Sequence, residues 1–363
     1  MRRRGKIIAL AALLFFAAIG GLLFWTYREL HAPIEHDKAD KYIEIPRGLS
    51  PSQIISRLSS EGIIRREWPL LVYIKFTGTG GRLKAGEYRF PSPISPLEVL
   101  KKLEEGEQRL NRFTVIEGWS RWEIAAALSR VPEMNLENAD AAFALMNDTS
   151  AIRDIDAEAT NLEGYLYPDT YNFPPDATPD AMIALMVKRF RQQWKPEWDE
   201  KAHALNMSPH QIVTIASLIE TEAKLPEERP VIASVIYNRL KKNIPLGVDS
   251  TIIYASKLAG KWKNDGKVYK SDVERQSPYN TRLNKGLPPG PIASPSLSSL
   301  EAALNPADTD YLYYVREPSR NDGAHNFYNN EADFERGVQA LRNWERARDA
   351  GTRPSDNSNE DSQ

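Results

Sequence analysis

The sequence contains no cysteine, so disulfide bonds, cysteine nucleophiles and thiolate metal sites are excluded. Its five histidines show no metal-ligand spacing, and neither a metal nor an organic cofactor is expected. A G-x-S-x-G elbow and a phosphate-binding glycine loop are also missing, which argues against a serine triad. With 47 basic and 49 acidic residues the formal net charge is -2, so nucleic acid is not an expected partner.

One long hydrophobic run lies at the N-terminus. The uncharged residues 7–27 follow a basic flank at 1–6, and roughly 20 residues match the thickness of a bilayer core. The run exceeds the apolar core of a signal peptide, so we expect an uncleaved transmembrane helix; a cleaved signal is the alternative. Because basic flanks stay cytoplasmic, residues 1–6 should be cytoplasmic and everything from Arg28 onward should lie outside the cytoplasm.

A pattern of strand, turn and helix occurs twice after this run. Residues 42–45 alternate as a strand and lead to a helix start at Ser50 and Pro51. The pattern returns about 70 residues later, where the matching positions are Gly118, Ser120, Ile124 and Leu128 for Gly48, Ser50, Ile54 and Leu58. The first occurrence resembles the LysM-like entry of glycan-associated domains, and a plain spacer domain is the alternative.

These patterns predict an α+β fold, and a hydrophobic content of 41% supports compact cores. The expected segments are a tether at 28–40, the LysM-like module at 41–110, a connecting α+β segment at 111–160, a mixed α+β domain at 161–346 and a disordered acidic tail at 347–363. The mixed domain should hold helices at 179–194, 212–223 and 230–241 and a hairpin of 311–315 with 325–328.

The helix at 212–223 carries two carboxylates, Glu220 and Glu222, in an otherwise aliphatic run. Ser208 followed by Pro209 is a strong helix start. A carboxyl among aliphatic groups loses solvation when charged, so its pKa should rise toward the range of a general acid. The two side chains lie roughly 160° apart around a helix and cannot easily flank one scissile bond. At most one is catalytic; the alternative is that both are boundary residues of a core helix.

Several further strings follow one another in a fixed order: Leu162–Tyr171, Ala216–Glu222, Val231–Leu240, Ser277–Thr281, Gly286–Ile292, Ala302–Pro306 and Tyr311–Val315. Together they resemble the YceG-like (MltG) family of endolytic murein transglycosylases. The resemblance covers nearly the whole chain, because the family also has one N-terminal span and a LysM-like module. It implies that residues 161–346 form the catalytic domain.

The resemblance places the catalytic acid at Glu220 and makes Glu222 a supporting residue. The implied reaction cleaves the bond between N-acetylmuramic acid and N-acetylglucosamine in nascent peptidoglycan without water, leaving a 1,6-anhydro end. One carboxyl can protonate the leaving oxygen and then accept the proton of the attacking C6 hydroxyl. The implied enzyme is a single-pass inner-membrane protein with a periplasmic catalytic domain, which ends glycan elongation beside peptidoglycan synthases.

The positions best matched to sugar hydroxyl and acetamido groups are Asn238, Tyr279, Asn280 and Thr281; helix and loop capping is the alternative. Three tyrosines, Tyr165, Tyr167 and Tyr171, are expected to pack the domain seam rather than to stack on sugars. The stretch from Gly286 to Pro291 should form a rigid wall of the cleft.

Two departures from the family pattern stand out. Asp249, Ser250 and Thr251 replace a common D-P-T string, and no second histidine lies near 330–334, which leaves His325 as a structural residue. A muramidase-type hydrolase would need a second carboxylate about 5–9.5 Å from the acid, for which the candidates are Glu163 and Asp249. A non-enzymatic scaffold that binds glycan through the LysM-like module is the third reading.

Overall fold

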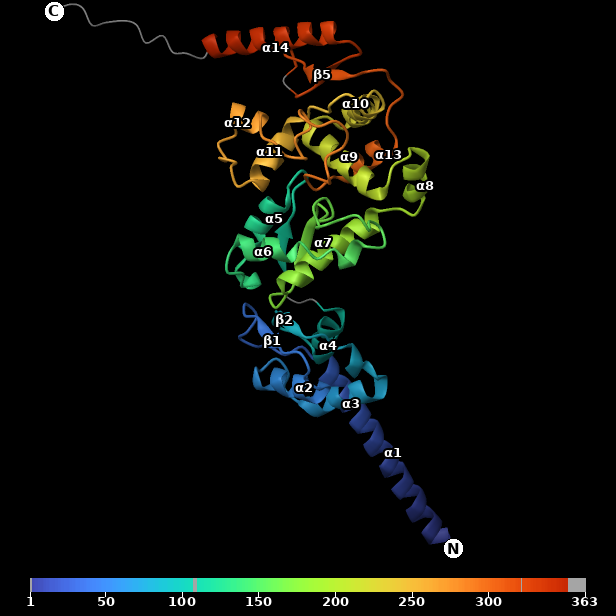
Figure 1. Ribbon diagram of the computed structural model, residues 1–363. Helices are drawn as coiled ribbons and strands as arrows, with labels where there is room; N and C mark the ends of the chain where they lie inside the picture. Colours follow the sequence, from blue (N-terminus) through green and yellow to red (C-terminus); the bar gives the residue numbers. More distant parts are fainter. Residues whose placement is uncertain (1, 107–109, 321, 352–363) are drawn as a thin grey trace, which may run out of the picture. The chain divides into compact units, whose positions relative to one another are not determined.

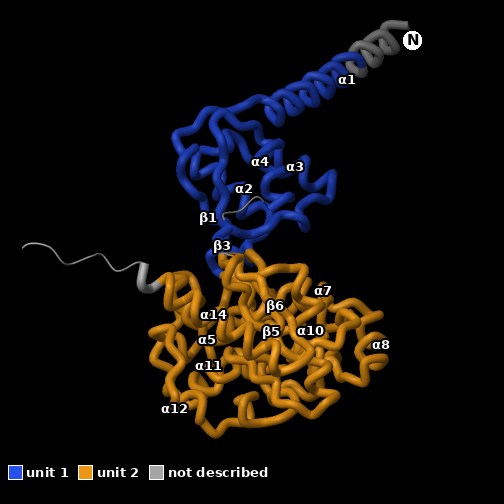
Figure 2. Tube along the Cα trace, turned by 90° about the horizontal axis from the view of Figure 1, so that it is seen from above, with its two compact units in different colours: residues 1–112, 172–176 blue, residues 113–171, 177–363 orange. Residues whose placement is uncertain are grey.

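The computed structural model describes residues 2–106, 110–320 and 322–351. The chain forms two compact units (Figure 2): unit 1 holds Met1–Arg112 and Asn172–Asp176, and unit 2 holds Phe113–Tyr171 and Ala177–Gln363. The expected connecting segment at 111–160 therefore lies, except for its first two residues, in the same unit as the expected catalytic domain. Both units mix helices with short strands, which confirms the α+β class.

Unit 1 has the order α1 (Arg2–His31), β1 (Ile43–Ile45), α2 (Pro51–Ser60), α3 (Glu67–Thr77), η1 (Thr79–Arg82), β2 (Gly86–Tyr88) and α4 (Pro96–Glu105). The strands β1 and β2 are antiparallel, with Ile43 opposite Tyr88. Ile43 and Ile45 are buried and Glu44 is exposed, as the alternation of a strand with one face on a core requires. Ser50 and Gln53 form a capping box that starts α2 at the predicted residue.

Helix α1 contains the predicted transmembrane run. Its segment Leu13–His31 has a mean hydropathy of 1.3 and is long and apolar enough to cross a membrane. Its C-terminal end packs onto unit 1, because Leu30 belongs to the buried core and Trp25 stacks on Trp68 with ring centroids 5.2 Å apart. The expected tether at 28–40 is therefore partly helical, and Ile34 pairs with Ile94 beyond it.

Unit 2 places one helix, α9 (Pro209–Glu222), at the centre of the others (Figure 1). Helix α9 packs against α8 (Glu197–Ala204), α10 (Arg229–Lys241), α11 (Asp249–Leu258) and α13 (Leu297–Leu304). The remaining helices of eight or more residues are α5 (Arg121–Leu128), α7 (Pro179–Gln193) and α14 (Glu331–Gly351). Shorter helical elements are α6 (Ala139–Leu145), α12 (Lys270–Val273), η2 (Pro132–Met134), η3 (Ser150–Ile152) and η4 (Pro226–Glu228).

Short strands complete the fold. Strand β3 (Asn111–Thr114) pairs with β4 (Thr170–Phe173), and β5 (Tyr313–Arg316) forms an antiparallel hairpin with β6 (His325–Tyr328), as predicted. Helix α14 reaches Gly351, so the expected disordered tail at 347–363 begins inside a helix, and residues 352–363 lie outside the described residues. Acidic and basic side chains alternate along this helix and favour it over a solvated coil.

The predicted repeat of strand, turn and helix is real at the level of local structure. Gly48 and Gly118 both adopt positive φ, at 83° and 78°, and each turn leads to a serine N-cap. Ser120 forms a capping box with Glu123 at the start of α5, as Ser50 does with Gln53 at α2. The second copy lies beside the carboxylate helix, where Gly118 approaches Glu220.

Candidate active site

Helix α9 begins where the sequence predicts and is buried along most of its length. Ser208 accepts a hydrogen bond from the backbone N–H of Gln211, and the Gln211 side chain accepts one from Ser208 N–H. Every residue from Ile212 to Ile219 is buried, so the helix is fixed in rotation by its neighbours. Its last turn then presents Glu220 and Glu222 in different directions, as the helical phase requires.

Glu220 is held by the N-terminus of α13 and by an arginine. Its Oε2 accepts hydrogen bonds from Ser296 N–H at 2.8 Å and Ser296 Oγ at 2.5 Å, and its Oε1 lies 3.4 Å from the Arg229 guanidinium. The Glu220 side chain is only 5% exposed. Charge-assisted donors of this kind stabilise a carboxylate anion strongly. Glu220 is thus a buried, oriented group whose anionic form has three donors.

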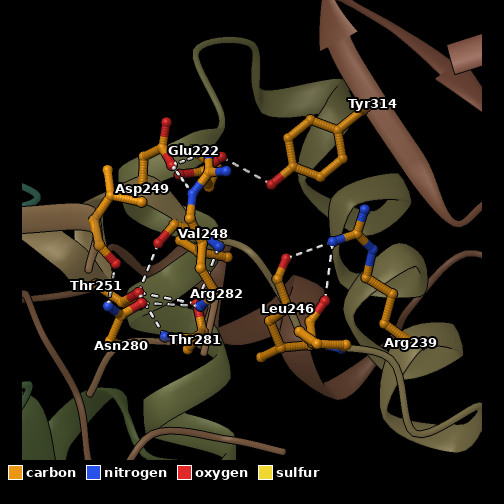
Figure 3. Close-up of polar contacts among 12 residues, drawn as sticks. Glu222, Arg239, Leu246, Val248, Asp249, Thr251, Asn280, Thr281, Arg282 and Tyr314 are labelled. Carbon is orange, nitrogen blue, oxygen red and sulfur yellow. Dashed lines mark hydrogen bonds and ion pairs between the residues drawn. The ribbon is translucent and has the colours of Figure 1, made fainter. Parts of the chain in front are cut away.

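Glu222 lies in a different setting, against the β5 strand (Figure 3). Its Oε2 accepts a hydrogen bond from Tyr314 at 2.8 Å, and Asp249 and Arg282 lie nearby as an ion pair of their own. Burial raises the pKa of Glu222 above its usual range; the Tyr314 hydrogen bond opposes this shift, and the charge of Asp249 adds to it. Burial therefore favours the protonated form of Glu222.

A third carboxylate, which no sequence motif singled out, lies near Glu220. Glu117 precedes Gly118 in the turn between β3 and α5, and its side chain is exposed in part. Partial burial and the negative charge of Glu220 raise the pKa of Glu117, while Arg229 lowers it. Glu117 and Glu220 thus share the field of one guanidinium. The sequence signal for Glu117 was the repeated pattern of strand and turn, which placed a charged residue directly before the glycine of the turn.

A pocket of about 320 Å³ opens beside this last turn of α9. We call it the Thr221 pocket; Gly118, Trp119, Glu123, Thr221, Tyr254 and Lys257 are among the residues that line it. Its volume lies within the usual range for small-molecule sites. A Cβ atom built on Gly118 would lie 4.0 Å from Glu220 Cγ, so the glycine leaves space between the pocket wall and the acid. The hydroxyl groups of Thr221 and Ser250 form a hydrogen bond of 2.7 Å, which holds these two lining residues of the pocket together.

The four predicted sugar-binding positions have most of their polar groups engaged within the protein. The Asn238 amide donates to the carbonyls of Thr309 and Tyr311, and the Asn280 amide donates to those of Val273 and Arg275. Thr281 is buried and bonds to Thr251 and to the backbone of Val248 (Figure 3). These contacts shape the loops around α9. Direct contact with a sugar stays a prediction.

Tyr279 differs from the other three because its ring borders the Thr221 pocket through Tyr254. The two ring centroids lie 4.8 Å apart, and Tyr254 lines the pocket. Burial raises the pKa of Tyr279, so its phenol is a neutral donor near pH 7. Tyr165, Tyr167 and Tyr171 are buried, in agreement with their expected packing role.

The two candidates for a second catalytic carboxylate bond to other groups than Glu220. Glu163 is buried and accepts hydrogen bonds from Arg121 N–H and from the Tyr254 hydroxyl. Burial raises the pKa of Glu163 to about 7, although the positive charge of Arg121 lowers it in part. Asp249 is exposed and pairs with Arg282 at 2.6 Å. His325 bonds to Glu228 at 2.8 Å, which fits the structural role expected for it.

The first turn of α9 is tied to the proline-rich wall by His210. Its Nδ1 lies 2.7 Å from Asp156 Oδ2, and its Nε2 lies 2.8 Å from the carbonyl oxygen of Pro289. Both partners are acceptors, so both ring nitrogens must carry hydrogen to satisfy them. Burial opposes the charged ring, but the bonds to Asp156 and Pro289 outweigh it and raise the pKa of His210. Imidazolium at this position holds the Gly286–Pro291 wall.

This geometry predicts a pH dependence of stability. Because the folded pKa of His210 is raised, its contribution is fully present below the unfolded value of about 6.5 and is lost as the pH rises through the folded value. We expect His210→Gln to lose about 2 kcal/mol at pH 6 and less at pH 9. Thermal unfolding between those pH values measures this. The exposed His203 gives the matched control, His203→Gln; parallel curves for wild type and His210→Gln would contradict the assignment.

Comparison with known proteins establishes the family. The model of the YceG-like family matches residues 43–340, and the chain belongs to this family. An endolytic murein transglycosylase of Bacillus subtilis (strain 168) is 38% identical over 317 residues, covering 82% of this chain and 84% of that protein. A Streptococcus pneumoniae protein (serotype 2, strain D39) of the same name is 29% identical over 362 residues, covering 92% of this chain and 65% of its own.

A solved structure agrees with the fold. The 2.6 Å crystal structure of a yceG-like protein from Listeria monocytogenes matches with a TM-score of 0.54 and 32% sequence identity. The match covers 81% of this chain and 97% of that chain. The resemblance inferred from the ordered strings is thereby confirmed.

Proposed function

We propose that the chain is an endolytic lytic transglycosylase that cleaves the β-1,4 bond between N-acetylmuramic acid and N-acetylglucosamine in nascent glycan strands. Two relatives that it matches over most of its length are named endolytic murein transglycosylases. The observation that supports this assignment best is the setting of Glu220, a buried carboxylate oriented by Ser296 and Arg229 beside the Thr221 pocket. No second acid is needed for a lytic reaction.

Glu220 has two tasks in this mechanism. In its protonated form it gives a proton to the oxygen that leaves C1 of the muramic acid as the glycosidic bond breaks. The resulting carboxylate then takes the proton of the C6 hydroxyl, whose oxygen forms the new bond to C1 and closes the 1,6-anhydro ring. The donors on Ser296 and Arg229 stabilise the carboxylate between these steps. Water is neither consumed nor released.

A second candidate function follows from Glu117. A hydrolase of the muramidase kind needs a second carboxylate near the acid, and Glu117 is the side chain whose pKa responds to the charge of Glu220. In that reaction Glu117 would activate water or attack C1, and the products would carry reducing ends. The lytic reaction remains our first proposal because it agrees with the named activity of the relatives.

Unit 1 indicates where in the cell the enzyme acts. We infer that α1 anchors the chain in the inner membrane with its basic N-terminus in the cytoplasm, so the part of unit 1 that follows α1 and the whole of unit 2 lie in the periplasm. The order of β1, α2, α3 and β2, with the two strands antiparallel, supports a LysM-like glycan-binding role for unit 1. A membrane-anchored terminase of glycan elongation would act beside peptidoglycan synthases, where new strands emerge.

Product mass tests the reaction. Uncrosslinked glycan strands are incubated with the full-length chain, and the new ends are analysed by mass spectrometry. An anhydro end is one water lighter than a reducing end, so we expect only the lighter product. Reducing ends alone would reject the lytic assignment and favour the hydrolase. Intact strands would reject both and leave a glycan-binding scaffold.

A further inference from the structure

A second pocket adjoins the Thr221 pocket on the surface of unit 2. It has a volume of about 420 Å³ and is lined by Trp122, Trp262 and Asn264, among others. Glu123 and Lys257 line both pockets, so the two hollows meet at this pair of side chains. We call the combined feature the tryptophan groove. It extends from Thr221, the residue after Glu220, to the loop that follows α11.

Two indole rings in this groove lack an aromatic partner. Trp119 lines the Thr221 pocket and Trp262 lines the second pocket, and neither stacks on another ring in the described part of the chain. Trp122 differs: it stacks on Phe143 at 5.3 Å and meets Tyr254 edge-on at 5.0 Å. Trp122 is therefore a rigid wall, whereas Trp119 and Trp262 offer ring surface.

Trp262 is unusual for its position in the chain. It lies in an exposed segment, residues 258–268, in which it is the single half-buried residue. It donates no hydrogen bond to any described residue, so no polar contact explains why an indole stands there. A large, partly buried aromatic ring that lines a pocket is suited to contact a ligand there.

Glu123 and Lys257, which line both pockets, provide the polar groups of the groove. Lys257 bonds to Glu123, and Glu123 also accepts hydrogen bonds from Ser120 N–H and Oγ. Burial alone would raise the pKa of Glu123, but the bonds from Lys257 and Ser120 lower it, so the pair is charged. Among the described residues Glu123 uses one of the three N–H donors of Lys257. Donors and acceptors therefore remain for a neutral, hydroxyl-rich ligand.

We propose that the tryptophan groove binds the glycan strand beyond the scissile bond, with sugar rings on Trp119 and Trp262 and hydroxyl or acetamido groups at Glu123 and Lys257. A pyranose has C–H groups on its faces and polar groups on its edge, which matches indole faces flanking a charged pair. A ligand that contacts both rings must extend through both pockets, as a strand of several sugars can. This inference rests on the proposed function, because it takes glycan as the substrate.

The test compares glycan strands of graded length with the full-length chain. Trp262→Ala should raise KM for long strands about tenfold, the equivalent of about 1.4 kcal/mol, and change kcat by less than about twofold. Trp262→Phe keeps a ring face and should recover most of the affinity. Fragments too short to reach Trp262 should be cleaved equally by all three proteins. An unchanged KM for long strands overturns the proposal.

The control is another half-buried indole of unit 2 outside the groove. Trp344 lies on α14, and the guanidinium groups of Arg316 and Arg348 lie over its ring. We expect Trp344→Ala to leave KM unchanged. An equal rise in KM for both alanine variants would overturn the assignment. Calorimetric binding of long strands to Glu220→Gln, with and without Trp262→Ala, separates the groove from the reaction: tenfold weaker binding supports the groove even where no anhydro ends form, and equal binding overturns it.

Discussion

Glu220→Gln should reduce cleavage of glycan strands by about 10³-fold, because an amide neither donates the proton to the leaving oxygen nor accepts one from the C6 hydroxyl. The glutamine oxygen can still accept the hydrogen bonds that Ser296 donates to Glu220, so the fold should persist. Arg229 loses its ion pair but keeps a hydrogen bond to Ser299. We expect the thermal midpoint to fall by less than about 5 °C. Release of anhydro ends per unit time measures the activity.

Two further variants make this result specific. Glu227 is exposed in η4, and Glu227→Gln should leave the rate within about twofold of wild type. Glu222→Gln keeps an acceptor for Tyr314 and should cost at most about tenfold, as expected of a supporting residue. The opposite order, in which Glu222→Gln is inactive and Glu220→Gln is active, would transfer the acid role to Glu222, whose pKa burial raises.

Local sequence signals predicted where the helix that carries this site begins and in which directions its side chains point. Ser208 and Pro209 fixed the start of α9, and the helical period alone showed that Glu220 and Glu222 point to different neighbours. The partners themselves were beyond reach, since Ser296 is 76 residues from Glu220 and Tyr314 is 92 residues from Glu222. Which donors each carboxyl meets depends on how those distant segments fold, so the helical pattern predicts the directions of the two side chains but not their partners.

Helix α11 is an element that the sequence alone did not predict. It supplies Ser250, Tyr254 and Lys257 to the Thr221 pocket, yet its start was not predicted. Its N-cap is Val248, which has no side-chain acceptor, so the usual sequence signal is missing. The helix is stabilised instead by tertiary contacts such as the bond from Tyr254 to Glu163. Glu163, considered as a catalytic candidate, is thus a buried support for the pocket.

Gly164→Ala should destabilise unit 2 by about 3 kcal/mol and lower the thermal midpoint by about 10 °C. Gly164 has φ of 82°, a conformation that costs an alanine about 1 kcal/mol. A Cβ there would also lie 2.7 Å from Pro291 Cβ and 2.9 Å from Val213 Cγ1. Both neighbours are buried, one in the proline-rich wall and one in α9, so neither can move freely.

Gly286→Ala is the matched control for this prediction, because Gly286 has φ of 86° but no neighbouring atom lies within 4 Å of the place that the alanine methyl group would take. It should cost only the backbone strain, about 1 kcal/mol and about 3 °C. The difference between the variants isolates the crowding at Gly164, where the wall meets the carboxylate helix. Equal shifts would mean that the wall yields to a methyl group. In that case Gly286–Pro291 could not hold a fixed distance from α9, and its role as a rigid border of the cleft would fail with it.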